Sequence, residues 1–205
     1  MSGLFITLEG GDGAGKSTQA QLLEQWLVGL GRTVVRTREP GGTDVGEQIR
    51  EIVLHHRGDI APRAEALLYA ADRAHHIATK VRPALEAGNV VIQDRYIDSS
   101  VAYQGAGRVL SGDTIRDLSL WAVDGLLPDL TVLLDLDETA ARERLDAAKK
   151  RFDRLEAEKA EFHARVRAAY LELAASDSRF IVLDASRAPE EIAADVRVRV
   201  ETLLG

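Results

Sequence analysis

The glycine-rich stretch at residues 10–18, GGDGAGKST, constrains this chain more than any other feature. It follows a short apolar run at 4–8 and precedes 19–30, where apolar residues recur at helical spacing. A strand, a glycine loop and a helix in this order are typical of a phosphate-binding loop. An ordinary glycine-rich turn is the alternative, but such a turn does not require Lys16 and Ser17. The stretch therefore predicts binding of a nucleoside triphosphate.

Each residue type in this loop has a physical role. Glycines let backbone N–H groups turn toward a phosphate, and the start of the helix adds partial positive charge. Lys16 can reach the outer phosphates, and the Ser17 hydroxyl can bind Mg²⁺. The residues expected to hold the triphosphate are Gly10, Gly11, Asp12, Gly13, Ala14, Gly15, Lys16, Ser17 and Thr18.

Length and composition narrow the class of protein. The 205 residues fit one domain, 1–205, with a substantial core. A net charge of −7 argues against nucleic acid polymers as partners. No apolar run approaches the roughly 20 residues that span a bilayer, and we expect no membrane partner. The sequence contains no cysteine, which agrees with a cytoplasmic location.

Strand-like and helix-like segments alternate along the chain. Five apolar strands separated by helices predict an α/β fold of three layers, a five-stranded parallel sheet with helices on both faces. Pro83 should kink or restart the helix that contains it. The expected strands are 4–8, 33–38, 89–93, 130–136 and 179–183. The expected helices are 19–30, 45–55 (with Ile49, Ile52 and Val53 inward), 63–86, 113–124 and a last one with Ile192, Val196, Val200 and Leu203 on one stripe.

Charged residues follow the predicted strands, where parallel sheets bind their ligands. Arg38-Glu39-Pro40 follows the second strand, and Asp94-Arg95 follows the third. Asp94 can hold Mg²⁺ directly or through water opposite Ser17. Arg95 offers a planar donor fork to a phosphate. A structural Asp–Arg pair at the sheet edge is the alternative, but a phosphate loop in the same sheet favours function.

Two further patterns suggest ligand contacts. Tyr69 and Arg73 are four residues apart on a predicted helix, so a ring and a guanidinium could read one base together; a core residue beside a surface ion pair is the alternative. Residues 142–154 carry six bases against three acids. A basic segment that closes over polyphosphate would stabilise charge and exclude water. A solvated helix face is the other interpretation.

Together these stretches resemble the thymidylate kinase family of P-loop nucleoside monophosphate kinases, which phosphorylate dTMP with ATP. The matching stretches run along essentially the whole chain: LEGGDGAGKST at 8–18, REPGGT at 38–43, LLYAADRAHH at 67–76, DRYIDSSVAYQG at 94–105, DRLE at 153–156 and FHARVRAAYLEL at 162–173. The resemblance implies transfer of the ATP γ-phosphoryl group to dTMP in dTTP synthesis, with Mg²⁺ as cofactor. It also implies a homodimer joined through helices, for which 63–87 and 97–125 could supply the face.

The resemblance also implies roles for individual residues. Catalytic roles fall on Lys16, Asp12, Arg95, Arg154, Lys150 and Arg151. The dTMP site would comprise Arg38, Pro40, Tyr69, Arg73, Arg95, Ser100, Tyr103 and Gln104. Ser17 and Asp94 would hold the metal, Arg187 is a candidate adenine contact, and 142–156 would form a basic lid over ATP.

Two positions depart from the family pattern. Ala14 stands where one branch of the family carries a catalytic arginine, so the sequence resembles the branch whose lid supplies the charge. The lid here has lysines where an arginine is expected, which leaves open whether Lys149, Lys150 or Arg151 reaches the phosphoryl group. Tyr69 stands for the usual Phe and adds a hydroxyl that needs a partner.

Two other classes of function fit part of this sequence. Another nucleotide or deoxynucleoside kinase would share the ATP half and differ at 67–76 and 94–105. A GTPase switch or ATP-driven binding module would need neither an acceptor-like loop at 38–43 nor a basic lid, and the sequence has no Asn-Lys-x-Asp motif. The five histidines lack zinc-like spacing, so we expect them at the surface or in the core.

Overall fold

The computed structural model describes residues 3–108, 110–147, 153–156 and 158–205. Its sheet has the strand order β2-β3-β1-β4-β5, and every neighbouring pair is parallel. The predicted five-stranded parallel sheet is therefore confirmed. The strands are β1 (Leu4–Glu9), β2 (Val34–Arg38), β3 (Val90–Asp94), β4 (Leu130–Asp135) and β5 (Phe180–Asp184).

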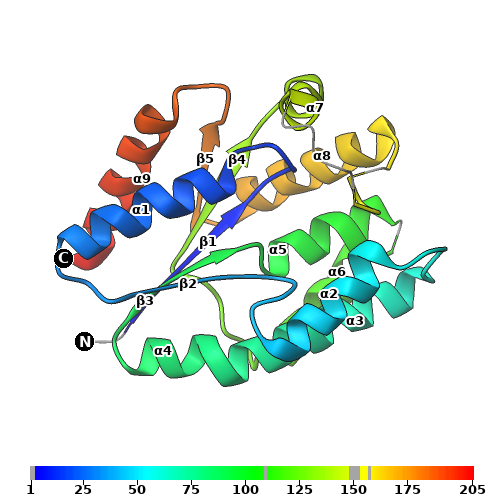
Figure 1. The fold of residues 1–205 in the computed structure, drawn as a ribbon, viewed down its shortest axis with the longest axis horizontal. Helices are drawn as coiled ribbons and strands as arrows, with labels where there is room; N and C mark the ends of the chain where they lie inside the picture. The colour runs from blue at the N-terminus through cyan, green and yellow to red at the C-terminus, as the bar shows by residue number, and fades with distance from the viewer. Residues whose placement is uncertain (1–2, 109, 148–152, 157) are drawn as a thin grey trace.

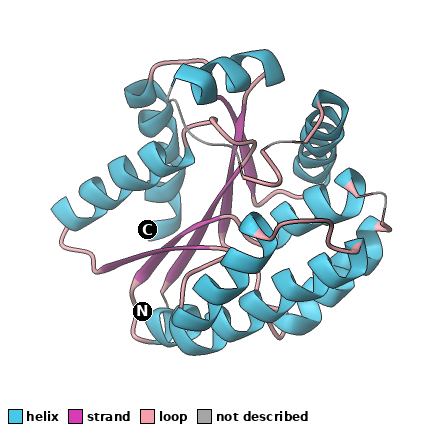
Figure 2. Cartoon of the chain, turned by 45° about the vertical axis from the view of Figure 1, so that its right-hand side comes forward, coloured by secondary structure: helices cyan, strands magenta, loops and turns pink. Residues whose placement is uncertain are grey.

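Helices cover both faces of this sheet (Figures 1 and 2). Two of them, α1 and α9, lie together on one face, and α4, α5 and α8 pack with their neighbours on the other. The described helices are α1 (Lys16–Gly29), α2 (Asp44–His55), α3 (Pro62–His76), the π-helical η1 (Ile77–Val81), α4 (Arg82–Glu86), α5 (Ile97–Ser100), the π-helical η2 (Val101–Gly107), α6 (Gly112–Ala122), α7 (Glu138–Ala147), α8 (Ala160–Ser176) and α9 (Pro189–Leu204).

Alternation along the strands explains why both faces are covered. Ile6 and Leu8 point to one face and join a buried cluster with Leu27 of α1. Phe5 points to the other face and packs edge-on against Tyr96, with ring centroids 5.1 Å apart. Each such aliphatic or aromatic side chain contributes about 1.5–3 kcal/mol on burial. A strand with apolar residues on both faces requires helices on both faces.

The phosphate loop lies where the order of the strands reverses. From β1 the chain passes through α1 to β2 on one side, whereas β4 and β5 lie on the other. Loops at such a reversal point diverge and leave a crevice beyond the carboxyl ends of the strands. The fold therefore places the loop between β1 and α1 at the expected ligand site.

The long helix predicted at 63–86 is interrupted as Pro83 suggests. α3 runs into the π-helical η1, and α4 begins at Arg82 with Pro83 in its first turn. A proline is tolerated there because its missing N–H has no helical partner to lose. The helix is thus restarted without leaving helical backbone angles.

Two predicted core positions are wrong: Ile52 of α2, and Leu203, which lies in the last turn of α9 and is 36% exposed. Ile52 is 45% exposed, whereas Val53 and Leu54 are buried. The inward stripe of α2 is made by Gly46, Ile49, Arg50, Val53 and Leu54, which follow i, i+3, i+4, i+7 and i+8. Ile52 lies beside that stripe. Within the described ranges, no helix is both long and apolar enough to cross a membrane.

Candidate active site

The phosphate loop is shaped by glycines that no other residue could replace. Gly10 and Gly13 have φ angles of 128° and 82°. A Cβ on Gly10 would lie 2.3 Å from the Leu134 carbonyl oxygen, and one on Gly13 would lie 2.9 Å from that of Ala141. Since L-residues disfavour positive φ and the contacts are with backbone, both positions require glycine. The loop can therefore pack closely against β4 and α7, and its backbone N–H groups can turn toward a ligand.

Lys16 lies over this loop. Its Nζ donates to the carbonyl oxygens of Gly10 at 3.1 Å and Gly11 at 2.8 Å, and the residue is only 7% exposed. Burial lowers the pKa of Lys16, and so does the nearby charge of Arg95, whereas Asp94 raises it. The ammonium is held in place by backbone oxygens, at the position from which it could reach a bound phosphate.

Arg95 joins the end of β3 to the phosphate loop. Its backbone is in the left-handed region, with φ of 67°, a conformation that few residues other than glycine adopt. The guanidinium donates to Asp12 Oδ1 at 2.6 Å and to the Tyr103 hydroxyl at 3.2 Å. It also donates to Ser99 Oγ at 3.3 Å and to the Tyr170 hydroxyl at 3.4 Å. The structure thus brings Asp12 and Arg95, both predicted site residues, into direct contact.

A buried carboxylate supports this turn. Glu9 accepts hydrogen bonds from the Tyr96 backbone N–H at 2.7 Å, from Ser99 Oγ at 2.6 Å and from the Tyr170 hydroxyl at 2.9 Å. Burial, followed by the nearby charge of Asp98, raises the pKa of Glu9 to about 7, although the Ser99 hydrogen bond opposes the shift. Glu9 is not among the site residues predicted from the sequence. A carboxylate that ends an apolar strand was the available signal.

A cavity of about 100 Å³ opens beside Arg95. Seven of the eight residues predicted for dTMP line it: Pro40, Tyr69, Arg73, Arg95, Ser100, Tyr103 and Gln104. We call it the acceptor cavity. Arg38 lies outside it and pairs with Glu47 at 2.8 Å, half-exposed in the neighbouring cleft. Arg50, which the sequence analysis missed, also lines the cavity and donates to the Pro40 carbonyl oxygen at 2.9 Å.

Arg73 forms part of the wall of this cavity and is 2% exposed. Its Nε donates to Glu39 Oε2 at 2.8 Å, and its two Nη atoms donate to Ser119 Oγ at 3.1 Å and Ser100 Oγ at 3.0 Å. His76 Nδ1 lies 2.9 Å from the other oxygen of Glu39. His76 is therefore a core residue, as expected for the histidines. Pairing with Glu39 compensates for burial of the guanidinium and holds it in one position.

The cleft on the other side of Asp94 contains the predicted metal residues. Ser17 and Asp94 both line it, and its volume is about 570 Å³. Asp94 Oδ1 is buried with no hydrogen-bond partner in the described part of the chain. An acceptor-only oxygen left in this state fits a cation or a water that carries one. No group of three or more acidic, histidine or cysteine side chains suited to a metal occurs among the described residues, so an ion here would need oxygens from a ligand or water.

The basic segment divides into two parts. α7 has no buried residue, yet Arg144 donates to the carbonyl oxygens of Gly13 at 3.4 Å and Ala185 at 2.9 Å. Lys149, Lys150 and Arg151 lie outside the described residues. Arg154 donates from Nε to the Val53 carbonyl oxygen at 2.9 Å and pairs with Glu65. Its contacts are therefore with α2 and α3, beside the acceptor cavity, and not with the phosphate loop.

Arg187 lies in the loop between β5 and α9. It is paired with Asp195 at 2.7 Å and lies 3.7 Å from Glu191. These ion pairs hold the side chain at the surface next to the backbone that Arg144 contacts. Its guanidinium is 38% exposed and accessible to a ligand from solvent.

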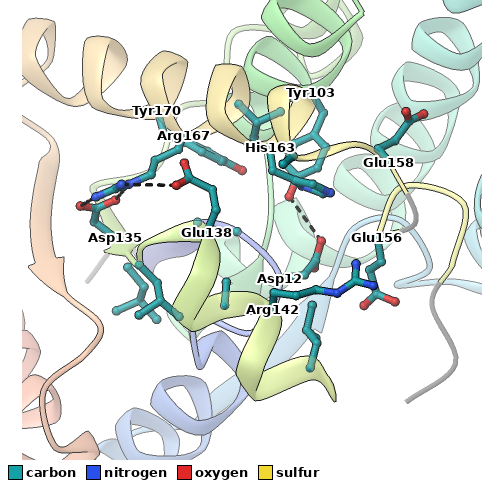
Figure 3. A pocket seen from close by; sticks show the side chains of 18 of the residues that line it. Asp12, Tyr103, Asp135, Glu138, Arg142, Glu156, Glu158, His163, Arg167 and Tyr170 are labelled. Atoms are coloured by element: carbon teal, nitrogen blue, oxygen red, sulfur yellow. Dashed lines mark hydrogen bonds and ion pairs between the residues drawn. The ribbon is translucent and has the colours of Figure 1, made fainter. Parts of the chain in front are cut away.

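A second cavity, of about 310 Å³, lies on the α7 and α8 side of the loop. Asp12, Tyr103 and Glu156 line both this cavity and the acceptor cavity. Figure 3 shows Asp12 and Tyr103 facing each other across a hydrogen bond of 3.4 Å. Arg167 of α8 lies between Asp135 and Glu138, so it ties α8 to the end of β4 and the start of α7 (Figure 3).

Comparisons with known proteins agree on one family. A model of the thymidylate kinase family matches residues 8–196. The thymidylate kinase of Leifsonia xyli subsp. xyli is 77% identical over 199 residues, which cover 97% of this chain and 95% of that protein. The one from Clavibacter sepedonicus is 70% identical over 205 residues, 100% of this chain and 97% of that protein. A crystal structure of thymidylate kinase from Ehrlichia chaffeensis superposes with a TM-score of 0.79 at 30% identity, covering 98% of this chain and 99% of that one.

Proposed function

The chain belongs to the thymidylate kinase family and phosphorylates dTMP with ATP, and we propose that the acceptor cavity binds dTMP while the phosphate loop binds ATP. The observation that supports this division is the contact of 2.6 Å between Arg95, at the edge of the acceptor cavity, and Asp12, within the phosphate loop. A side chain at this contact can reach both the acceptor phosphate and the transferred phosphoryl group. Positioning of this kind supplies most of the catalysis in phosphoryl transfer.

On the acceptor side, the base stacks on Tyr69 and is hydrogen-bonded by Arg73. Ser100 and Gln104 border the base, and Tyr103 lies against the deoxyribose, where its ring disfavours a 2′-hydroxyl. The acceptor phosphate lies against Arg95, with Arg38 at the end of β2 and Pro40 in the following loop at its approach. The buried, paired state of Arg73 supports this role, because a fixed guanidinium discriminates between bases better than a mobile one.

On the donor side, the loop amides and Lys16 hold the ATP phosphates. The acceptor phosphate oxygen is already a nucleophile at neutral pH, so transfer is direct and in line. Asp12 lies near the transferred group and orients Arg95. Lys150 and Arg151, outside the described residues, provide positive charge from the lid, and Arg187 borders the adenine. Arg154, which pairs with Glu65 beside the acceptor cavity, holds the end of the lid.

We also propose that Ser17 and Asp94 hold Mg²⁺ with the ATP phosphates. The unpartnered Oδ1 of Asp94 supports this assignment. A bound Mg²⁺ would neutralise charge that develops on the phosphate oxygens during transfer. The two side chains themselves need only orient the ion, one through a hydroxyl and the other through a carboxylate.

A homodimer and a cytoplasmic location complete the proposal. Trp121 of α6 is 81% exposed and Leu67 of α3 is 57% exposed. α3 and α6 pack against each other, and contiguous exposed apolar surface often marks an interface with a partner. Sedimentation of a dimer that Trp121→Arg converts to the 22.3 kDa monomer is the expected result. A wild-type chain that sediments only as a monomer would contradict it.

The reaction is tested by ADP release with ATP and Mg²⁺ against dTMP, dUMP, dCMP, dGMP, AMP and thymidine. We expect strong turnover with dTMP, weaker turnover with dUMP and little with the others. Best turnover with a purine or cytidine nucleotide would keep the ATP half of the proposal and discard the acceptor half. ADP release that no acceptor stimulates would contradict both halves and favour an ATP-driven binding module.

A further inference from the structure

The carboxylate of Glu65 is fully buried, and the reaction described above does not use it. It lies in the first turn of α3, one helical turn before Tyr69, and it does not line the acceptor cavity. Three side chains from other parts of the chain converge on it: Gln104, Arg108 and Arg154. A buried carboxylate is costly unless it is paired, so this convergence needs a physical reason.

The first contact fixes an amide. Gln104 Nε2 donates to Glu65 Oε1 at 3.0 Å, and Gln104 is 1% exposed. An ionised carboxylate only accepts hydrogen bonds, so it must face the NH₂ end of the amide. The carbonyl oxygen of Gln104 is then the end left for the acceptor cavity, which Gln104 lines. Glu65 therefore determines whether Gln104 presents a hydrogen-bond acceptor or a hydrogen-bond donor to the acceptor cavity.

The second contact fixes the end of the lid. Arg154 pairs with the other oxygen of Glu65, and its backbone N–H donates to the Leu54 carbonyl oxygen at 3.1 Å. The next two residues, Leu155 and Glu156, line the acceptor cavity. Anchoring Arg154 thus places one wall of that cavity.

The third contact balances the charge. Arg108 lies 3.4 Å from Glu65 Oε1 and 2.5 Å from Glu158 Oε1. Two guanidinium groups consequently pair with two carboxylates, which compensates for the burial of Glu65. Glu158 is 28% exposed and, within the described part of the chain, makes no hydrogen bond to Gln104 or Arg154, so it offers a matched comparison.

We propose that Glu65 is a positioning residue for acceptor selectivity: it turns the Gln104 carbonyl oxygen toward the base and holds the lid end through Arg154. A carbonyl oxygen at this place accepts from the ring N–H of thymine or uracil. It repels cytosine, whose corresponding ring nitrogen is an acceptor. This inference rests on the proposed binding of dTMP in the acceptor cavity.

The test compares kcat/KM for dTMP and dCMP in the wild type, Glu65→Gln, Gln104→Met and Glu158→Gln. In Glu65→Gln the neutral partner no longer dictates the amide orientation, and the dTMP preference should fall about tenfold. Gln104→Met should lower the preference to a similar degree. The double variant should lose no more than either single one, because both changes act on one contact. Glu158→Gln should keep the wild-type preference.

Amide hydrogen exchange at Arg154 separates the two parts of this role. Exchange should accelerate in Glu65→Gln and stay unchanged in Gln104→Met, which leaves the lid anchor intact. An unchanged dTMP preference in Glu65→Gln, with only a lower Tm, would overturn the inference, and so would an unchanged preference in Gln104→Met if Glu65→Gln does not fold. A wild type that prefers another acceptor to dTMP would instead contradict the proposed function.

Discussion

The acceptor side and the donor side of the site are built differently. On the acceptor side, Glu9, Glu39, Glu65 and Arg73 are buried, and each has two or more polar partners. On the donor side, the described part of α7 has no buried residue. The difference indicates that selectivity for the acceptor is set before ligands bind, whereas the surroundings of ATP are completed when it binds.

Energetics support this contrast. Removing one member of a buried ion pair costs about 3–5 kcal/mol because it leaves an uncompensated charge. Exposed pairs contribute about 0–1 kcal/mol and can rearrange freely. Buried residues of the acceptor side are therefore held in one geometry, while the surface ion pairs of α7 allow it to move.

Lys16→Ala should have the largest effect, because Lys16 is the side chain proposed to hold the ATP phosphates. We expect kcat to fall on the order of 1000-fold, since the proposed role makes Lys16 a preorganised charge that faces the transferred phosphoryl group. Single-turnover measurement of dTDP formation would establish this. Lys80→Ala, which changes a lysine that contacts the Gly42 carbonyl oxygen in the neighbouring cleft, is the control. Activity of Lys16→Ala within tenfold of the wild type would show that the loop works without its ammonium.

Arg73→Ala tests the acceptor side directly. Loss of the guanidinium leaves Glu39 buried, so the free energy of unfolding should fall by about 3 kcal/mol or more. Arg142→Ala on α7, which removes a half-exposed pair with Asp146, should change it by less than about 1 kcal/mol. Chemical denaturation measures both variants.

Ligand titration of the folded Arg73→Ala protein should show weaker dTMP binding and nearly unchanged ATP binding. The opposite result, with ATP affinity damaged and dTMP affinity preserved, would mean that the two ligand sites have been exchanged in the proposal.

The pH dependence of stability should reflect Glu9, whose pKa rises from 4.5 to about 7 on folding. Between these values the folded state binds more protons than the unfolded state, so this carboxyl makes the protein less stable as pH rises from 4.5 to 7. Arg95, Asp98, Tyr170 and Lys16 surround the group, and Asp98 acts in the same direction as burial. Glu9→Gln should remove this slope, on the order of 2 kcal/mol over the interval.

Denaturation of the wild type and Glu9→Gln at pH 5, 6, 7 and 8 measures that difference. Asp72, whose pKa burial raises to about 6, adds a slope of the same sign to both proteins and cancels in the comparison. Parallel stability curves for the two proteins would show that Glu9 keeps an ordinary pKa.

Arg187→Ala should have the smallest effect. It tests whether the donor side is less rigidly built than the acceptor side. Its guanidinium is exposed and paired with Asp195, so the KM for ATP should rise about two- to fivefold while the KM for dTMP stays constant. Initial-rate kinetics with each substrate varied in turn would measure both. A tenfold or larger rise would indicate that the donor side is as fixed as the acceptor side.

Much of the fold and of the site could be predicted because the signals are local. The apolar runs predict the sheet, and the glycine-rich stretch predicts the phosphate loop at its reversal point. The stretches REPGGT and DRY follow two strands, so they predict residues that meet at one edge of the sheet. The partners that hold them could not be found this way. Glu9 and Tyr170 are 161 residues apart, and Glu65 and Arg154 are 89 apart, so only the folded chain brings them together.

The basic segment shows the same limit. Composition indicated positive charge over ATP, but the described contacts of Arg154 lie with Val53 and Glu65. The sequence pattern also does not predict the helices at 97–107 and 160–176, although stretches that resemble the family lie within both. In η2 the backbone departs from the regular helical repeat, which a search for 3.6-residue periodicity does not detect.

The π-helical turn of η2 has a consequence for how relatives of this chain can differ in length. Tyr103 and Gln104 both lie in its seven residues. A π-helical turn holds one residue more than a turn of a regular α-helix. Deleting one residue here would restore the regular repeat, so later helices would keep their register while the side chains inside the turn changed direction. Tyr103 and Gln104 lie inside it and would leave their present partners together. A one-residue gap within 101–107 is therefore a better sign of altered acceptor choice than a substitution at either of these positions.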